Sequence, residues 1–348
     1  MPSGSGAALP AYRSLSTPET YNAFLWHSPL GFRTNHLVRT LIVIVLAPLV
    51  SSAGGWAKHS EIVQRIPFTL YQNHLVVAVG SLGGLEQKHL LIDTGTNVCM
   101  VDTATAHELG LEKVGQRIGG MSVIDGVAQI YYSVLPAMDL GPIHRGSMPV
   151  AVSNLAWLHD KAGVRIDAVI GLDALAPLNF QIDYETRTLN FGAIRVPRSA
   201  VPVVKTDGLL MVQAQVNGAP VNLMVDTGGS SLVLFAESLP KSVTSQTLQA
   251  TSKLTNLAGQ ADLRKLNIKT FSIGETSLND STALIAGSPV CCHLQGILGI
   301  SAMQFRRIDF DFGRGMVGFE LSDPNAFVPF GTATHGATLV PQQPTRLR

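Results

Sequence analysis

Short apolar runs follow one another along most of the chain, separated by clusters of glycine, proline, asparagine and serine. Runs of this length that are rich in valine, isoleucine and threonine are typical of β-strands. Helical patterns are few: residues 103–110 are expected to form one short helix that stops at Gly110, and residues 174–178 a second one that Pro177 interrupts. The pattern predicts an all-β fold class, mainly β with a few short helices.

Two stretches of the chain repeat the same order of elements. Each begins with an apolar run, continues through a turn, and ends in a second apolar run that leads into the triplet Asp-Thr-Gly. The turn of the second copy is Asn217-Gly218, and Asn-Gly between apolar runs is a strong hairpin signal. The triplets are Asp93-Thr94-Gly95 and Asp226-Thr227-Gly228, and the runs that open the two stretches are 75–79 and 210–216.

The repeat extends beyond the triplets. A hydrophobic-hydrophobic-Gly element follows each triplet at a similar distance, at residues 168–172 and 296–300. A similar pair of short apolar segments comes after each element, at 182–184 with 189–191 and at 308–310 with 317–319. The period is too long for a solenoid repeat, so it predicts two homologous lobes.

Two aspartates in equivalent positions point to acid–base chemistry. A single Asp-Thr-Gly is ordinary turn chemistry after a strand, and a given three-residue word occurs by chance on the order of 0.1 times in a chain of this length. Two copies in duplicated contexts are better explained by two carboxylates that meet. Like charges held close split their pKa values, so that one carboxyl can act as base and the other as acid on one water molecule.

In these features the chain resembles the retropepsin-like aspartic protease family, in a two-lobed single-chain form, over about residues 62–320. The resemblance implies two homologous pepsin- or retropepsin-like β-barrel lobes with the active-site cleft between them. It implies an aspartic endopeptidase that hydrolyses peptide bonds with a water molecule activated between Asp93 and Asp226. The threonine hydroxyls would lock the two loops together, and the residues implied to support the active-site loops are Thr94, Gly95, Thr96, Thr227 and Gly228.

The same resemblance suggests a flap over the substrate in each lobe. In the first lobe the candidate is residues 117–121, with Ile118, Gly119 and Gly120 as substrate-binding residues. In the second lobe it is residues 257–260, with Ala258 and Gly259, which match the family pattern less well. A plain hairpin turn at Gly119-Gly120 is the competing interpretation.

The two loops differ in the residue after the glycine. Thr96 follows Gly95, whereas Gly229 follows Gly228, so that the nearest hydroxyl of the second loop is on Ser230. A hydroxyl that donates to a carboxylate favours its charged form. The sequence therefore predicts that Thr96 donates to Asp93 and that Asp93 is the more easily ionised of the pair.

Composition limits the partners. The chain has 348 residues, a net charge of +1 and no basic stripe, so no electrostatic case exists for nucleic acid. The expected partner is a polypeptide substrate, the expected state is a monomer with an intramolecular dyad, and no cofactor and no metal are required. The alternative is a secreted or membrane-anchored non-catalytic peptide-binding protein on a protease-like scaffold, because a fold does not guarantee a function.

The first residues are interpreted as a targeting segment. An apolar core at 41–50 follows a basic flank and precedes the small residues Ser51-Ser52-Ala53, as in a secretory signal, while an uncleaved membrane anchor is the rival interpretation. The protein is therefore expected to be exported, to the periplasm or the extracellular space. The expected organisation is an N-terminal extension with signal peptide or anchor at 1–57, lobes at 58–197 and 198–322, and a flexible tail at 323–348.

The remaining candidates for chemistry are assigned structural roles. Cys99 is expected to be a small core residue, and a disulfide from it to Cys291 or Cys292 is left open. The acidic residues without a partner in the other repeat are expected to lie at the surface or in turns; they are Asp102, Asp125, Asp139, Asp167 and Asp173.

Overall fold

A computed structural model describes residues 64–114, 118–121, 127–194, 196–206, 208–244, 248–256, 259–287, 294–300, 303 and 305–322. These residues fall within one compact unit, His59–Arg348. The expected leader at 1–57, including its apolar core at 41–50, and the expected tail at 323–348 lie outside them. Within the described ranges, no helix is long and apolar enough to cross a membrane.

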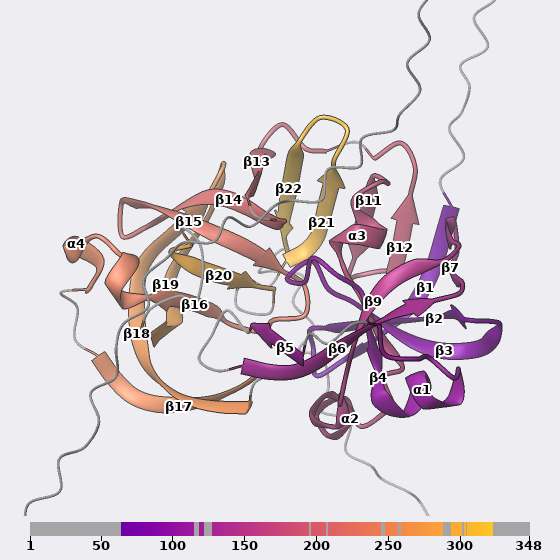
Figure 1. Ribbon diagram of the computed structural model, residues 1–348. Helices are drawn as coiled ribbons and strands as arrows, with labels where there is room; N and C mark the ends of the chain where they lie inside the picture. Colours follow the sequence, from indigo (N-terminus) through magenta and orange to yellow (C-terminus); the bar gives the residue numbers. More distant parts are fainter. Residues whose placement is uncertain are drawn as a thin grey trace, which may run out of the picture. The chain divides into compact units, whose positions relative to one another are not determined.

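Strands dominate the described chain and the helices are short, which confirms the predicted all-β class (Figure 1). The elements up to residue 194 are, in order, β1 (Gln64–Tyr71), β2 (Leu75–Leu82), β3 (Leu85–Ile92), β4 (Met100–Asp102), α1 (Thr103–Glu108), β5 (Ile118–Met121), β6 (Val127–Leu135), β7 (Met138–Leu140), β8 (Ile143–Arg145), β9 (Met148–Ser153), α2 (Ala156–Ala162), β10 (Ala168–Ile170), α3 (Leu172–Leu175), β11 (Phe180–Asp183) and β12 (Thr188–Phe191).

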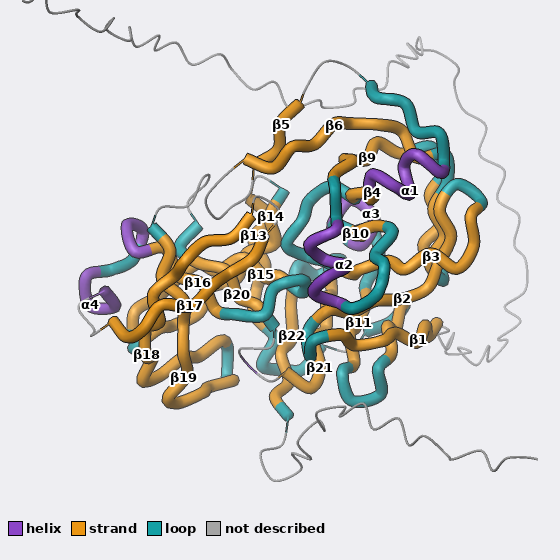
Figure 2. The backbone as a smooth tube through the Cα atoms, turned by 90° about the horizontal axis from the view of Figure 1, so that it is seen from below, coloured by secondary structure: helices purple, strands orange, loops and turns teal. Residues whose placement is uncertain are grey.

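The elements of the second half repeat this order with longer hairpins. They are β13 (Val201–Thr206), β14 (Leu209–Val216), β15 (Ala219–Asp226), β16 (Leu232–Phe235), the 3₁₀ helix η1 (Ala236–Ser238), α4 (Lys241–Thr244), β17 (Leu248–Asn256), β18 (Gly259–Ile273), β19 (Thr276–Ala286), β20 (Gly296–Gly299), β21 (Phe305–Asp311) and β22 (Met316–Leu321). The long strands β17, β18 and β19 pair in succession and lie together in Figure 2.

The internal duplication is visible in the strand pairing. In the first half β3 pairs with β2, and β10 runs parallel to β3 and antiparallel to β4. In the second half β15 pairs with β14, and β20 runs parallel to β15 and antiparallel to β16. The parallel pairs β4–β9 and β16–β19 extend the correspondence. The two halves therefore share one topology.

The Asn-Gly hairpin forms as predicted. Val216 pairs with Ala219, so the turn consists of two residues. Asn217 and Gly218 both have positive φ, at 50° and 79°. Turns of this kind match the twist of the flanking strands, and Asn and Gly adopt the left-handed region at little cost.

The strands beside the two triplets are buried on both faces. All residues of β10 and β20 are buried, as expected for short apolar strands inside a sheet that is covered on both sides. Their glycines are required by close packing. A Cβ on Gly299 would lie 2.5 Å from the backbone of Ser231, and one on Gly171 would lie 2.9 Å from the carbonyl oxygen of Thr96. Each hydrophobic-hydrophobic-Gly element therefore packs directly against an Asp-Thr-Gly loop.

A third sheet joins the two halves. Its strands run in the order β13, β22, β21, β11, β12, β1, all antiparallel, and β11 and β21 lie side by side in Figure 1. Ile182 faces Ile308 across the central pair, and the rings of Phe180 and Phe310 stack with centroids 4.5 Å apart. Because all four side chains are fully buried, this sheet continues the core from one half into the other.

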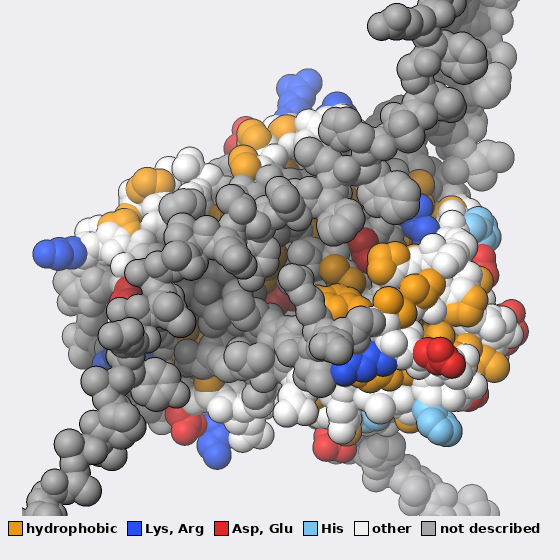
Figure 3. All heavy atoms as spheres, in the orientation of Figure 1, with side chains coloured by type: hydrophobic (Ala, Val, Ile, Leu, Met, Phe, Trp, Pro, Cys, Tyr) orange, Lys and Arg blue, Asp and Glu red, His pale blue; other side chains and the backbone are white. Residues whose placement is uncertain are grey.

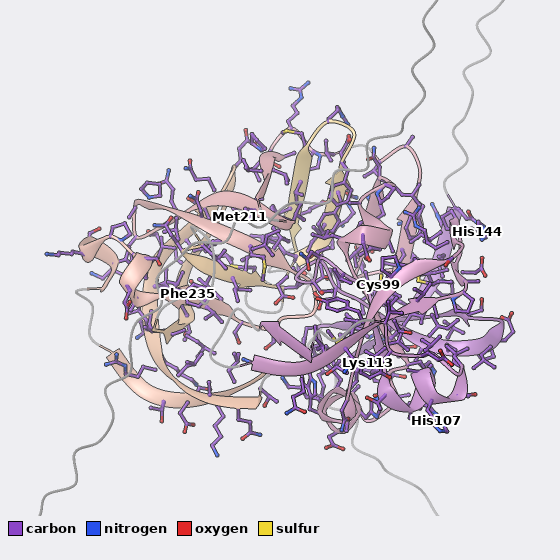
Figure 4. The ribbon with its side chains drawn as sticks, in the orientation of Figure 1. Cys99, His107, Lys113, His144, Met211 and Phe235 are labelled. Carbon is purple, nitrogen blue, oxygen red and sulfur yellow. The ribbon has the colours of Figure 1, made fainter. Side chains whose placement is uncertain are left out.

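Cores occupy both halves, as Figure 4 illustrates. Cys99 is 2% exposed and belongs to the main hydrophobic cluster, as expected, while Met211 and Phe235 belong to a cluster of the second half. The thiol of Cys99 is free and donates to the carboxylate of Asp173 at 2.9 Å. Cys291 and Cys292 lie outside the described residues.

The helices agree with the sequence only in part. Helix α1 begins after Asp102, whose carboxylate accepts the N–H of Ala104, and Gly110 follows it, as predicted. Helix α3 covers Leu172–Leu175, slightly earlier than expected. The sequence did not predict α2 or α4.

Two of the acidic residues expected at the surface or in turns are buried, so a surface position is wrong for both. Asp102 is 3% exposed and Asp167 is 4% exposed. Asp102 also accepts the N–H of Leu155, and Asp167 accepts the N–H of His89 and the hydroxyl of Thr105. Hydrogen bonds of this kind offset the cost of burying a carboxylate. Asp139 and Asp173 are exposed, and Asp125 lies outside the described residues.

Candidate active site

The two aspartates lie at the ends of equivalent strands. Asp93 follows β3, and its N–H donates to the carbonyl of Ile170 at 3.0 Å. Asp226 is the last residue of β15 and pairs with Gly299 of β20. Parallel pairing with a buried strand fixes each triplet against the hydrophobic-hydrophobic-Gly element of its own half. Both aspartates are therefore held by rigid parts of the fold.

The threonines of the triplets connect the two halves. The hydroxyl of Thr94 donates to the carbonyl of Val225 at 2.8 Å, and that of Thr227 donates to the carbonyl of Ile92 at 3.0 Å. Each hydroxyl also accepts the backbone N–H of the other threonine, at 3.0 and 3.2 Å. Both threonines are fully buried. Four buried hydrogen bonds thus set the distance between the two loops.

The glycines of the triplets leave room for the carboxyl group of the opposite loop. A Cβ on Gly95 would lie 2.6 Å from Oδ1 of Asp226, and one on Gly228 would lie 2.8 Å from Cγ of Asp93. Neither glycine has a positive φ. The close approach of the carboxyl groups, and not backbone conformation, requires glycine at these positions.

The two carboxyl groups face each other and accept backbone N–H groups: a Cβ on Gly95 would lie 2.6 Å from Oδ1 of Asp226 and 3.1 Å from Oδ1 of Asp93. Oδ1 of Asp93 accepts the N–H of Gly95 at 2.8 Å. Oδ1 of Asp226 accepts the N–H groups of Gly228 and Gly229 at 2.9 and 2.8 Å. A hydrogen bond between two carboxyl groups requires that one of them carries a proton. The geometry therefore suits a pair that shares a single proton.

Burial raises the pKa of Asp93. Burial, together with the negative charge of Asp93, raises the pKa of Asp226 well above its usual range. The order in which the two ionise, with Asp93 first, stays a prediction. The predicted cause was wrong: the hydroxyl of Thr96 donates to the carbonyl of Val98 at 3.1 Å and not to Asp93. A hydroxyl has one proton to donate, and the local turn brings the carbonyl two residues ahead within reach.

A cavity of about 230 Å³ opens beside the two carboxyl groups. Residues of both halves line it, and it contacts the catalytic candidates Asp93 and Asp226 directly. Apolar side chains dominate the wall from the first half. The second half adds the loop after Asp226 and the end of β17; these residues are Gly229, Ser230, Ser231, Leu254, Thr255 and Asn256. The cavity gives a ligand direct access to the paired carboxyl groups.

Comparison with known proteins agrees with this geometry. A sequence profile of the family described as Aspartyl protease matches the chain twice, at residues 78–174 and 212–302. Together the two matches cover more than half of the chain, and each contains one Asp-Thr-Gly triplet. The chain belongs to the aspartyl protease family.

Other comparisons add less. No curated protein matches the chain. Among solved structures, the chain is similar to Basic 7S globulin from soybean, with 15% sequence identity and a TM-score of 0.39, over 75% of this chain and 95% of that one. A likeness of this strength carries no argument on the function of this aspartyl protease homologue.

The flap candidates occupy two equivalent hairpins of the aspartyl protease fold. Ile118, Gly119 and Gly120 lie on β5, which pairs with β6, and the turn between these strands lies outside the described residues. In the second half Asn256 pairs with Gly259 across the tip of the β17–β18 hairpin. Gly259 has a φ of 131°, and Ala258 lies outside the described residues. Part of that hairpin reaches the cavity through residues 254–256.

The sequence analysis missed several of the residues that line the cavity. Trp157, Leu158 and Lys161 come from α2, which sequence patterns did not predict. The available signals were Asn154, whose side chain accepts the N–H of Ala156, and Gly163, which ends the helix with a φ of 71°. Outside this site, Lys and Arg side chains of the described residues are interspersed with Asp and Glu on the face shown in Figure 3.

Proposed function

We propose that this protein is an aspartic endopeptidase that hydrolyses peptide bonds with a water molecule activated between Asp93 and Asp226. One observation carries the proposal: two loops from equivalent halves, joined by buried threonine hydrogen bonds, bring two carboxyl groups face to face beside a cavity. The sequence profile of the family supports the same class of chemistry.

The chemistry follows from the shared proton. The ionised carboxylate takes a proton from the water molecule as the water attacks the scissile carbonyl. The protonated carboxyl donates its proton to the carbonyl oxygen, and a carboxyl then protonates the leaving nitrogen. Burial keeps one of the two carboxyl groups neutral at a pH where an isolated carboxyl would be charged. The two aspartates therefore supply both the acid and the base.

Site variants test the proposal directly. Asp93→Asn and Asp226→Asn are each expected to lower the cleavage of a denatured protein by at least about 10²-fold, because each removes the acid or the base. Asp262→Asn, on the exposed surface of β18, is the matched control and is expected to keep full activity. Circular dichroism checks that the variants fold.

The opposite outcome has a definite meaning. If either variant at Asp93 or Asp226 keeps most of its activity, the shared dyad is not the catalyst. If the folded wild-type protein binds peptides and cuts none of them between pH 3 and pH 8, about the span over which a carboxyl pair titrates, the protein is a peptide-binding protein on this scaffold.

A further inference from the structure

Helix α2 contributes a cation to the cavity that holds the two aspartates. Lys161 and Trp157 both line this cavity, together with Leu158. Residues four apart on a helix lie on the same face, so these two side chains form one wall. Lys161 is the cationic group of this wall, and the indole of Trp157 packs beside it.

Lys161 has no acidic partner among the described residues. No carboxylate of the described chain lies within 4.0 Å of its ammonium group, and the acids among the described residues that line the cavity with it are Asp93 and Asp226. The side chain is half-buried, and burial lowers the pKa of Lys161. Lysine is seldom removed from water without a partner. The ammonium group therefore has unused capacity for an anion.

Trp157 adds a second unused donor on the same wall. Its indole Nε1 is buried and has no hydrogen-bond partner among the described residues. A buried donor without an acceptor costs free energy that a suitable ligand recovers. The ring of His74 also lines this cavity; its Nδ1 donates to the carbonyl of Gln72, and burial lowers the pKa of the ring.

Lys161 also lies where the cavity continues into the second half. A further cavity of about 670 Å³ shares Lys161, Ser230 and Thr255 with the first. Lys253 and Lys265 line this second cavity, and Asp280 is the only acid among its described lining residues. The lining of the extended cleft on this side is therefore cationic and hydroxyl-rich.

We propose that Lys161 is a specificity-determining residue that binds a carboxylate of the peptide substrate beside the scissile bond. The carboxylate comes from a glutamate or aspartate side chain or from the C-terminus of the peptide. Trp157 supports the same contact as a neutral donor. This inference rests on the proposed function, because it assigns the substrate class of the same cleft.

The test uses four matched peptide sets. They carry Glu or Gln at each position around the scissile bond, and each ends in a free acid or an amide. The wild-type protein is expected to favour one type of carboxylate by about tenfold in kcat/KM, since a hydrogen bond to a charged group is worth this much. A preference for Glu over Gln assigns the contact to a side-chain carboxylate, and a preference for the free acid over the amide assigns it to the C-terminus.

Variants assign the preference to Lys161. Lys161→Met keeps the aliphatic stem. It is expected to bring the ratio of kcat/KM for the carboxylate peptide to kcat/KM for its amide counterpart close to one, while Lys161→Glu inverts this ratio. Trp157→Phe keeps the ring, removes the N–H and reduces the ratio less. The matched control is Lys269→Met, an exposed lysine of β18 that lines neither cavity and leaves the ratio unchanged.

The outcomes separate this inference from the proposed function. A wild-type protein without a carboxylate preference, or a preference that survives both Lys161 variants, overturns the role of Lys161 even if the peptides are cut. If no peptide is cut, the same ratio is measured as Kd on the Asp226→Asn protein. A preference there supports the inference while the proposed function fails. If Lys161→Met does not fold, Lys161→Glu decides, because it is expected to invert the ratio, and a decrease of the wild-type ratio with added salt is required as well.

Discussion

At the scale of single residues, each member of the Asp-Thr-Gly triplets has its own physical task. The aspartates meet, the threonines hydrogen bond to the opposite strand, and the glycines leave space for the opposite carboxyl group. Gly229 extends this logic, because a Cβ there would lie 2.7 Å from Oδ2 of Asp226. The first half has Thr96 at the equivalent position, so a side chain fits there.

We expect Gly95→Ala to lower kcat/KM by at least about 10²-fold, because the added methyl group displaces the carboxyl of Asp226 from its partner. Gly146→Ala is the matched control: a Cβ there meets no atom within 4 Å, so activity and Tm should stay at wild-type values. Steady-state kinetics on both variants checks the prediction. Full activity in Gly95→Ala would show that the loops have more room than this geometry gives.

Thr96→Ala is expected to leave the acid limb of the kcat/KM profile where it is in the wild-type protein. The hydroxyl donates to the carbonyl of Val98, so its removal leaves the hydrogen bonds of Asp93 intact. The measurement is the pH dependence of kcat/KM for both proteins, which should be bell-shaped for a shared-proton pair. An acid limb displaced to higher pH would show that the hydroxyl reaches Asp93 in the working enzyme.

The sequence predicted these residues because duplication makes a short motif informative. It did not predict the partner of the Thr96 hydroxyl, since the choice between Asp93 and the Val98 carbonyl depends on the exact path of the turn. Nor did it predict that Asp102 and Asp167 are buried. The carboxylate of Asp102 accepts the N–H of Leu155 and that of Asp167 accepts the N–H of His89, and in each pair the two residues are far apart in the chain.

At the scale of elements, the two triplet loops form one buried unit. Strands β3 and β15 end at this unit, and strands β10 and β20 support it from either side. The sequence predicted these strands from their apolar runs and glycines. It missed α2 because the helix is short and the residues that mark its two ends, Asn154 and Gly163, stand outside any apolar periodicity.

Thr227→Val tests how much this unit contributes to stability. The variant loses the hydrogen bond to the carbonyl of Ile92 and leaves the N–H of Thr94 without its acceptor. The expected cost is about 1–3 kcal/mol in the free energy of unfolding, measured by urea denaturation. Thr270→Val, at an exposed position of β18, is the control and should change stability by less than about 0.5 kcal/mol. Equal stability of both variants would contradict a structural role for the hydroxyl.

At the scale of the whole molecule, the sheet that contains β11 and β21 joins the two repeats through strand pairing. Ile182 faces Ile308, and these are equivalent positions of the repeat, so the approximate two-fold relation passes between them. The sequence contains both segments but gives no signal that they pair, because the two short strands are far apart in the chain. This sheet and the threonine hydrogen bonds hold the two aspartates at a fixed separation.

A pair of buried carboxyl groups has a consequence for the stability of the whole protein. Burial and the neighbouring charge raise the pKa of Asp226 above its unfolded value. Such a group contributes its full stability below the unfolded pKa of about 3.9 and loses that contribution as the pH rises through the folded pKa. Asparagine cannot ionise, so a protein with asparagine at position 226 does not become less stable as the pH rises through that pKa.

We therefore expect Asp226→Asn to have a higher Tm than the wild-type protein at pH 7, with the difference shrinking toward pH 4.

For Asp311→Asn, the difference in Tm from the wild-type protein is expected to have the opposite sign. Burial raises the pKa of Asp311, but hydrogen bonds from the N–H and side chain of Arg314 lower it further, so the net shift is downward. Its contribution is present above the unfolded pKa and lost as the pH falls, which makes Asp311→Asn less stable at pH 7. Thermal melts of the three proteins across this pH range check both signs. A Tm of Asp226→Asn that stays at or below the wild-type value at pH 7 would mean that ionising the pair costs the fold nothing.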